Sequence, residues 1–263
     1  MRIISQATDT TFLLIQMRKH QGSEKAEYQN FLGHSSLNTG QLNAINLFEE
    51  PNFSEKHLDN YDGFFIGGFS DDPNDSLALT EEYFPFLGAF EQILNYAISI
   101  RKPGLLSCGG FMIASVLLGG EICLDESMQE LDILSITRSG SEASDPLFQG
   151  CPKTFNIVSG HLKSTNILPP NCVLMASSTR CPIHVFKLKA APIYAFQGHP
   201  EISAGEVKDR VGPMRVNILG REKSMRNLLR GKGRREWLMV CLCDLFEWWL
   251  MSLSNSVLLN IYQ

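Results

Sequence analysis

Hydrophobic positions along the chain fall into short runs that are separated by polar and glycine-containing stretches. Short apolar runs bounded by turn residues predict buried strands, and longer mixed stretches predict helices. In the first half we expect strands at 12–17, 42–48, 61–66 and 104–107, and helices at 22–33, 80–99 and 109–118. In the second half the expected strands crowd together, at 131–137, 155–158, 173–176, 184–188 and 193–196.

This change in pattern indicates the fold class. Strands that alternate with helices are typical of a parallel sheet, whereas closely spaced strands pair in antiparallel fashion. The sequence therefore predicts an α/β fold, with an open, mostly parallel sheet, flanking helices and an antiparallel extension. Pro85 lies near the first turns of the expected helix at 80–99, or divides it.

Charge divides the chain near residue 205. Residues 206–235 carry ten basic and three acidic side chains, although the whole chain has a net charge of −5. We expect a domain over 1–205 and a tail over 206–263 that is first basic and then apolar and helical. The tail fits a solvated helix followed by a packed one better than a membrane-surface or partner-binding helix. The apolar stretch 237–251 is too short to span a bilayer and contains Asp244 and Glu247.

Composition excludes several classes of protein. A net charge of −5 provides no overall basic field to recruit nucleic acid. The seven cysteines are scattered and form no CxxC pair, so we expect neither a disulfide framework nor a structural metal site. The N-terminal apolar run is shorter than the core of an export signal. Together these features predict a cytoplasmic protein.

Cys108 is the strongest candidate for a chemically active residue. It lies between an expected strand and an expected helix and is followed by Gly109 and Gly110, which allow a sharp turn. At a helix N-terminus the dipole favours the thiolate, and the next N–H group can help to hold an oxyanion. A small buried cysteine without a chemical role is the alternative interpretation.

A second candidate pair follows the last expected strand. A thiolate nucleophile needs a base, and the base needs a carboxylate that orients it. His199 and Glu201 supply these two groups in the sequence Gly-His-Pro-Glu. The joint occurrence with Cys108 favours a catalytic set over isolated structural residues.

Gly67 and Gly68 end another expected strand, at the sheet edge where ligands bind in open α/β folds. An N–H group here would complete an oxyanion hole opposite Gly109. A simple tight turn explains these glycines equally well.

These residues resemble those of the class I glutamine amidotransferases, a family with a Cys-His-Glu triad. The resemblance is greatest to the stand-alone members that are similar to the glutaminase half of GMP synthase. The stretch 103–110 resembles the nucleophile elbow of the family, and 199–201 matches its His-Pro-Glu motif. Further similarities extend the resemblance over roughly 12–202.

The resemblance implies a role for each site residue. Cys108 would be the nucleophile, His199 the general base and acid, and Glu201 the orienting carboxylate, while Gly68 and Gly109 would supply the oxyanion N–H groups. The implied reaction is attack on a γ-glutamyl amide, release of ammonia and hydrolysis of a thioester. No cofactor is implied.

Three departures from the family pattern affect this interpretation. Leu106 stands where a glycine is usual, and Met112 replaces a glutamine that is expected to contact the substrate. A thioether accepts hydrogen bonds only weakly, so free glutamine is in doubt as the substrate. Gly198 replaces a bulky aromatic residue, which predicts looser packing around His199.

The sequence leaves two classes of function open. The leading hypothesis is a cysteine-dependent amidase, either a glutaminase that passes ammonia to an acceptor synthetase subunit or a hydrolase of γ-glutamyl peptides. The chain contains no GxxxxGK[ST] loop, so any synthesis would occur on a partner. The alternative is a catalytically silent regulatory or binding protein on the same fold.

Overall fold

The computed structural model describes residues 10–69, 77–140, 145–148 and 151–202 of the chain, and the predicted tail lies outside these residues. The described part contains the helices α1 (Gln21–His34), α2 (Leu87–Ser99) and α3 (Gly109–Leu117), and the short 3-10 segments η1 (Glu55–Asn60), η2 (Glu126–Met128) and η3 (Pro146–Phe148). Its strands are β1 (Phe12–Met17), β2 (Leu42–Asn46), β3 (Gly63–Phe69), β4 (Gly104–Ser107), β5 (Glu121–Cys123), β6 (Glu130–Arg138), β7 (Thr154–His161), β8 (Ser164–Ile167), β9 (Cys172–Ser177), β10 (Val185–Leu188) and β11 (Ile193–Phe196).

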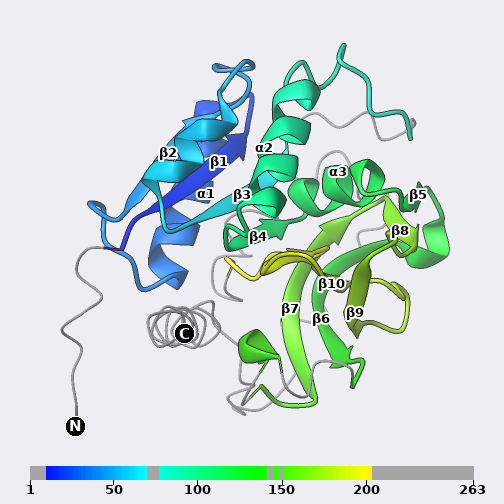
Figure 1. The fold of residues 1–263 in the computed structure, drawn as a ribbon. Coiled ribbons are helices and arrows are strands. Elements are labelled where there is room, and N and C mark those ends of the chain that lie inside the picture. The colour runs from blue at the N-terminus through cyan, green and yellow to red at the C-terminus, as the bar shows by residue number, and fades with distance from the viewer. Residues whose placement is uncertain (1–9, 70–76, 141–144, 149–150, 203–263) are drawn as a thin grey trace, which may run out of the picture.

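Nine of these strands form one mixed sheet in the order β2-β1-β3-β4-β11-β10-β9-β6-β7 (Figure 1). The strands from β2 to β11 in this order run parallel, and those from β10 to β7 continue the sheet in antiparallel fashion. The predicted fold class, a mostly parallel sheet with an antiparallel extension, is confirmed. β5 and β8 form a separate antiparallel pair.

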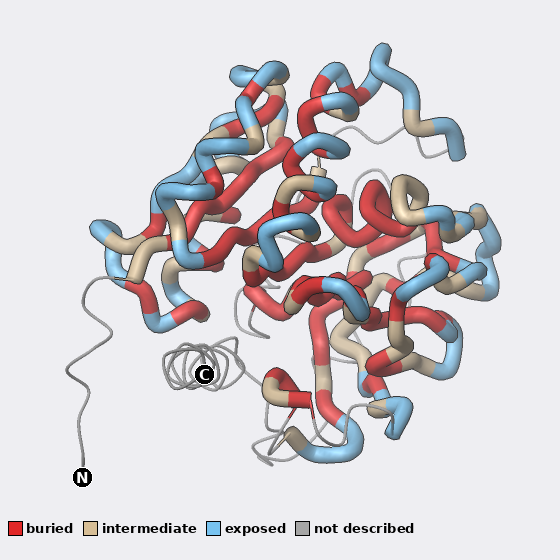
Figure 2. The backbone as a smooth tube through the Cα atoms, in the orientation of Figure 1, coloured by how far each residue is buried: buried red, intermediate tan, exposed pale blue. Residues whose placement is uncertain are grey.

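Alternating side chains of the central strands pack on opposite faces of the sheet. Leu13 and Ile15 of β1 belong to the core cluster that α2 and α3 cover, whereas Phe12 and Leu14 belong to the cluster that includes Phe31 of α1. The helices therefore cover both faces, and the parallel strands β1, β3, β4 and β11 are buried, whereas β2 at the sheet edge is partly exposed (Figure 2). Such continuous apolar strands match the short hydrophobic runs of the sequence.

Some predicted boundaries differ from the structure. The helix expected at 80–99 begins only at Leu87. Pro85 has no backbone N–H and disfavours helical geometry at the residue before it, so the helix starts after this proline. The strand expected to reach residue 48 ends at Asn46, and β5 and β8 were not predicted. Among the described residues no helix combines the length and apolar character needed to cross a membrane.

Candidate active site

The turn between β4 and α3 presents Cys108 in a strained conformation. Its backbone angles are φ 48° and ψ −98°, a region that residues with a side chain rarely adopt. The Cys108 N–H donates to the carbonyl of Phe196 over 2.8 Å, and the side chain remains partly exposed. Strain of this kind persists where surrounding structure enforces it and is concentrated at functional sites.

Close packing against β3 explains the glycines that follow this cysteine. A Cβ atom added to Gly109 would lie 2.6 Å from the backbone nitrogen of Phe69, and one added to Gly110 would lie 3.0 Å from Cγ2 of Ile66. A side chain at Gly109 would therefore separate the elbow from the end of β3. The N–H groups of Gly109 and Gly110 donate no backbone hydrogen bond within the described segments.

The order of strands in the sheet brings the loop that carries His199 to the same sheet edge as Cys108. β11 lies beside β4 in parallel, and Phe196 pairs with Ser107, so the residues that follow both strands meet at one edge. The His199 N–H donates to the carbonyl of Val158 in β7 over 2.7 Å. Only a glycine fits at position 198, because a Cβ there would lie 2.7 Å from the same carbonyl oxygen.

The structure corrects the expectation that Gly198 leaves His199 loosely packed. The His199 side chain is only 13% exposed. The absence of a side chain at Gly198 lets the loop approach β7 closely, and the hydrogen bond to Val158 then holds it there.

The three predicted residues Cys108, His199 and Glu201 lie close together. His199 Nδ1 lies 2.7 Å from Glu201 Oε1, and Cys108 lies close enough to the His199 ring to interact with it electrostatically. Ser107 Oγ donates to the same Glu201 oxygen over 3.2 Å. Glu201 is buried, so its carboxylate is held in a fixed orientation toward the imidazole.

Electrostatics favour a protonated imidazole at this position. Burial by itself lowers the pKa of His199, but the interactions of the ring with Glu201 and with Cys108 outweigh it and raise the pKa to about 10. His199 therefore carries a positive charge at neutral pH. Such an imidazolium can donate a proton to a leaving group.

The N–H group of Gly68 has a partner that the sequence did not reveal. It donates to Glu27 Oε1 over 2.9 Å, and Glu27 is in turn paired with Arg18 at 2.5 Å. The N–H therefore bonds to a carboxylate at the position where an oxyanion donor was expected. An oxyanion contact from Gly68 would require Glu27 to release this group.

Arg18 and Glu27 connect three elements at the switch point of the sheet. Arg18 directly follows β1, Glu27 lies on α1, and Arg18 Nη1 donates to the carbonyl of Phe69 at the end of β3 over 3.2 Å. The helix after β1 and the helix after β3 cover opposite faces, and ligands bind at such points in open α/β sheets. A charged residue directly after a buried strand was the sequence signal that could have identified Arg18.

Met112 occupies the first turn of α3 after Cys108, but its side chain belongs to the main hydrophobic core. Only 3% of the residue is exposed. It clusters with neighbours from the sheet and from α2. A direct contact with a substrate would require this side chain to leave the core.

Comparison with known proteins places these features in a family. The family model for glutamine amidotransferase class-I matches residues 27–213. The chain belongs to this family. The class I amidotransferase match includes Cys108, His199 and Glu201, and it extends into residues beyond the described segments.

Curated relatives of this chain include subunits of GMP synthase. The chain is 31% identical over 123 residues to a glutamine-hydrolyzing GMP synthase subunit from Pyrococcus abyssi, and 29% identical to that from Pyrococcus furiosus. Each match covers 45% of this chain and 61% of the relative. The chain thus spans less than two thirds of the length of these relatives.

Solved structures agree on the fold of the amidotransferase domain. A glutamine amidotransferase from Thermotoga maritima gives a TM-score of 0.65 at 16% identity, and the match covers 83% of this chain and 88% of that one. A putative GMP synthase subunit from Thermoplasma acidophilum gives 0.58 at 19% identity, covering 78% and 98%. These similarities establish the α/β architecture.

Proposed function

We propose that the protein is a cysteine-dependent amidase of the glutaminase type that acts on a γ-glutamyl amide. The observation that carries this proposal is the hydrogen bond between His199 and Glu201 beside Cys108, which lies on a strained turn at the start of α3. A thiol, an imidazole and a carboxylate in this order are the groups that covalent amide hydrolysis requires. Membership of the class I amidotransferase family supports the same reaction class.

The proposed reaction proceeds in two halves. The Cys108 sulfur attacks the side-chain amide carbon and forms a tetrahedral oxyanion, and His199 gives its proton to the leaving nitrogen, so that ammonia departs. This leaves a γ-glutamyl thioester on Cys108 and a neutral imidazole. Water then attacks the thioester while His199 takes a proton from it, which releases glutamate and restores the starting thiolate and imidazolium.

The oxyanion donors are part of the proposal. The N–H of Gly109 lies next to the nucleophile and donates no backbone hydrogen bond within the described residues, which leaves it available to a developing negative charge. The N–H of Gly68 is assigned as the second donor, and it is available only when Glu27 gives it up. Opening of the contact between Gly68 and Glu27 is therefore a required step in this scheme.

Substrate and partner follow by family analogy. The GMP synthase relatives are described as glutamine-hydrolyzing, which favours glutamine as substrate and a separate synthetase as ammonia acceptor. A γ-glutamyl peptide is the second candidate, because Met112 stands where the family has a glutamine and lies in the core. A cytoplasmic location remains a prediction from the sequence.

The test is ammonia release from glutamine and amine release from a panel of γ-glutamyl peptides. The proteins compared are the full chain, Cys108→Ala, and Cys123→Ala as a control that removes another partly exposed cysteine. We expect turnover by the full chain and by Cys123→Ala, and none by Cys108→Ala. His199→Ala should also abolish turnover, whereas Glu201→Ala should leave a remnant, because packing still orients the imidazole in part.

Equal rates for the full chain and Cys108→Ala would overturn the catalytic assignment. Turnover of peptides alone would establish the peptidase alternative. Absence of turnover on every substrate, with and without a candidate synthetase, would indicate the silent regulatory protein.

A further inference from the structure

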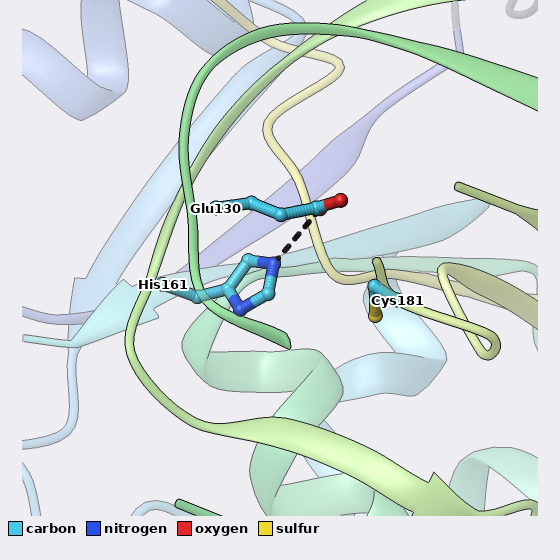
Figure 3. A group of neighbouring side chains, drawn as sticks. All are labelled: Glu130, His161 and Cys181. Carbon is cyan, nitrogen blue, oxygen red and sulfur yellow. Dashed lines mark hydrogen bonds and ion pairs between the residues drawn. The ribbon is translucent and has the colours of Figure 1, made fainter. Parts of the chain in front are cut away.

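A second cluster of reactive side chains lies at the antiparallel end of the sheet. Glu130 begins β6, His161 ends β7 directly opposite it in register, and Cys181 lies in the connection between β9 and β10. One donor atom from each of the three lies within 4.8 Å of the others (Figure 3). All three residues are buried, with 5% exposure or less, so water does not solvate their polar atoms freely.

The hydrogen bonds around His161 fix the position of its proton. Nδ1 lies 2.9 Å from the carbonyl oxygen of Lys163, which can only accept, so Nδ1 carries a hydrogen. Ser164 Oγ donates to the carbonyl of Met128 and therefore meets Nδ1 with a lone pair. The other ring nitrogen, Nε2, is left to face Glu130.

The second ring nitrogen of His161 faces a carboxylate oxygen. Nε2 lies 3.2 Å from Oε2 of Glu130. Either a second proton or a cation must lie between the two acceptors, because two lone pairs repel each other at this distance. The Cys181 sulfur completes the group as a third donor and is a preferred ligand of zinc once deprotonated.

The separations suit a tetrahedral metal ion. Zinc binds nitrogen and oxygen at about 2.0–2.2 Å and sulfur at about 2.3 Å, so two light ligands of one ion lie roughly 3.3–3.5 Å apart. The observed 3.2 Å between His161 and Glu130 is close to this separation. With every donor pair within 4.8 Å, movements of about 1 Å bring all three side chains into ligand distance.

Neighbouring groups orient the donors as the outer shell of a metal site does. His184 Nε2 lies 3.1 Å from Glu130 Oε2, and its Nδ1 has no hydrogen-bond partner among the described residues, so the proton sits on Nε2 and is donated to Glu130. Ser178 Oγ donates to the other carboxylate oxygen. Hydrogen bonds of this kind hold metal ligands in place.

We propose that Glu130, His161 and Cys181 bind one zinc-type divalent ion, with water at the fourth position. A donor set of thiolate, imidazole and carboxylate favours zinc over magnesium and calcium, which prefer oxygen alone. Binding displaces the thiol proton of Cys181 and the second ring proton of His161 when these are present. The sequence predicted no metal site because its cysteines form no CxxC pair, whereas these three residues lie 20 or more positions apart.

The ion would brace the strands behind the candidate active site. β7, which ends at His161, also supplies the Val158 carbonyl that holds the His199 N–H. The His184 carbonyl accepts from the Gln197 N–H over 2.8 Å, two residues before His199. A cation at this position would connect the two segments, at Val158 and at His184, that hold the loop carrying His199. Binding of the cation does not depend on the proposed amidase activity.

The test measures metal binding by the full chain carrying Cys108→Ala, since the thiol and imidazole of the candidate active site could themselves take up zinc. The protein is refolded from urea with zinc, because the site is buried, then dialysed and analysed for metal by mass spectrometry. We expect one zinc per chain, and after refolding with cobalt a thiolate-to-cobalt absorption band. An absence of bound metal in folded Cys108→Ala protein would overturn the proposal.

Three further variants in the same background locate the ion. Cys181→Ser should remove the cobalt band, and His184→Gln should weaken zinc binding by roughly 10- to 100-fold. Cys172→Ser, which changes a buried cysteine outside the cluster, should retain both metal and band. A cobalt band that persists in Cys181→Ser would also overturn the proposal. If Cys181→Ser does not fold, the metal content of the Cys108→Ala protein decides whether the proposal holds.

Discussion

The backbone N–H of Gly68 donates to Oε1 of Glu27 over 2.9 Å, at the point where β3 reaches the candidate active site. Arg18 neutralises this carboxylate, and Gln16 Nε2 donates to its other oxygen over 3.1 Å. A Cβ on Gly67 would lie 2.2 Å from the same carboxylate. α1 thereby controls the position of the strand end that faces Cys108.

Removal of Glu27 should destabilise the protein strongly. Glu27→Ala leaves the Arg18 guanidinium without its carboxylate, and loss of one partner of a buried ion pair costs about 3–5 kcal/mol. Urea unfolding of the two proteins measures the difference. Glu24→Ala, one turn earlier on α1 and partly exposed, is the matched control and should change stability by less than about 1 kcal/mol. Equal effects of the two changes would contradict a special role for Glu27.

Gly198→Ala should reduce turnover more than it reduces stability. The added Cβ would meet the Val158 carbonyl oxygen at 2.7 Å, so the loop that carries His199 must move away from β7. A displacement of about 1 Å in a catalytic group can lower the rate by roughly 100-fold. The initial rate on the preferred substrate is the measurement.

Gly33→Ala provides the control for this substitution. Gly33 lies within α1 and has no atoms within 4 Å of an added Cβ, so alanine there should leave the rate unchanged and raise helix stability slightly. An unchanged rate in Gly198→Ala would show that the close approach to β7 is not needed for activity.

The charge on His199 makes stability dependent on pH. The pKa of an unfolded histidine is about 6.5, whereas the pKa of folded His199 is about 10. The folded state holds this proton more tightly, so the contribution is complete below about pH 6.5 and is lost as the pH rises through about 10. Unfolding free energies of the full chain and His199→Gln, measured across this range, should converge toward alkaline pH.

Glu201→Gln tests the origin of this behaviour. Removal of the carboxylate charge takes away a main cause of the raised pKa of His199. The stabilising contribution should then disappear at a lower pH than in the unmodified protein. A pH dependence that is unaffected by Glu201→Gln would assign the raised pKa to other groups.

Met112→Gln should destabilise the protein. The residue is 3% exposed within an apolar cluster, and an amide buried there without partners costs about 1–3 kcal/mol. Thermal unfolding measures this loss, and Met112→Leu, which keeps the volume, should cost less than about 1.5 kcal/mol. A fully stable Met112→Gln with faster turnover of glutamine would instead show that the side chain reaches the substrate.

Local sequence patterns determined most of the fold. The strands β1, β4 and β11 have the predicted bounds, because each is a short apolar run that ends at polar or glycine residues. The turn at Cys108 and the position of His199 and Glu201 after a strand could also be predicted from the sequence. These features depend on neighbouring residues in the chain, which a single sequence contains.

Only the tertiary structure decided which groups meet. The sequence by itself placed Gly68 at a strand end, but its partner Glu27 depends on how α1 packs against the end of β3. Met112 was expected to contact a substrate, and its 3% exposure within the core cluster depends on how α3 packs against the sheet. Glu130, His161 and Cys181 come together because β6 and β7 pair in one register and the β9–β10 connection folds against them. Strand order and helix packing arise from contacts between distant segments, so spacing along the chain did not reveal them.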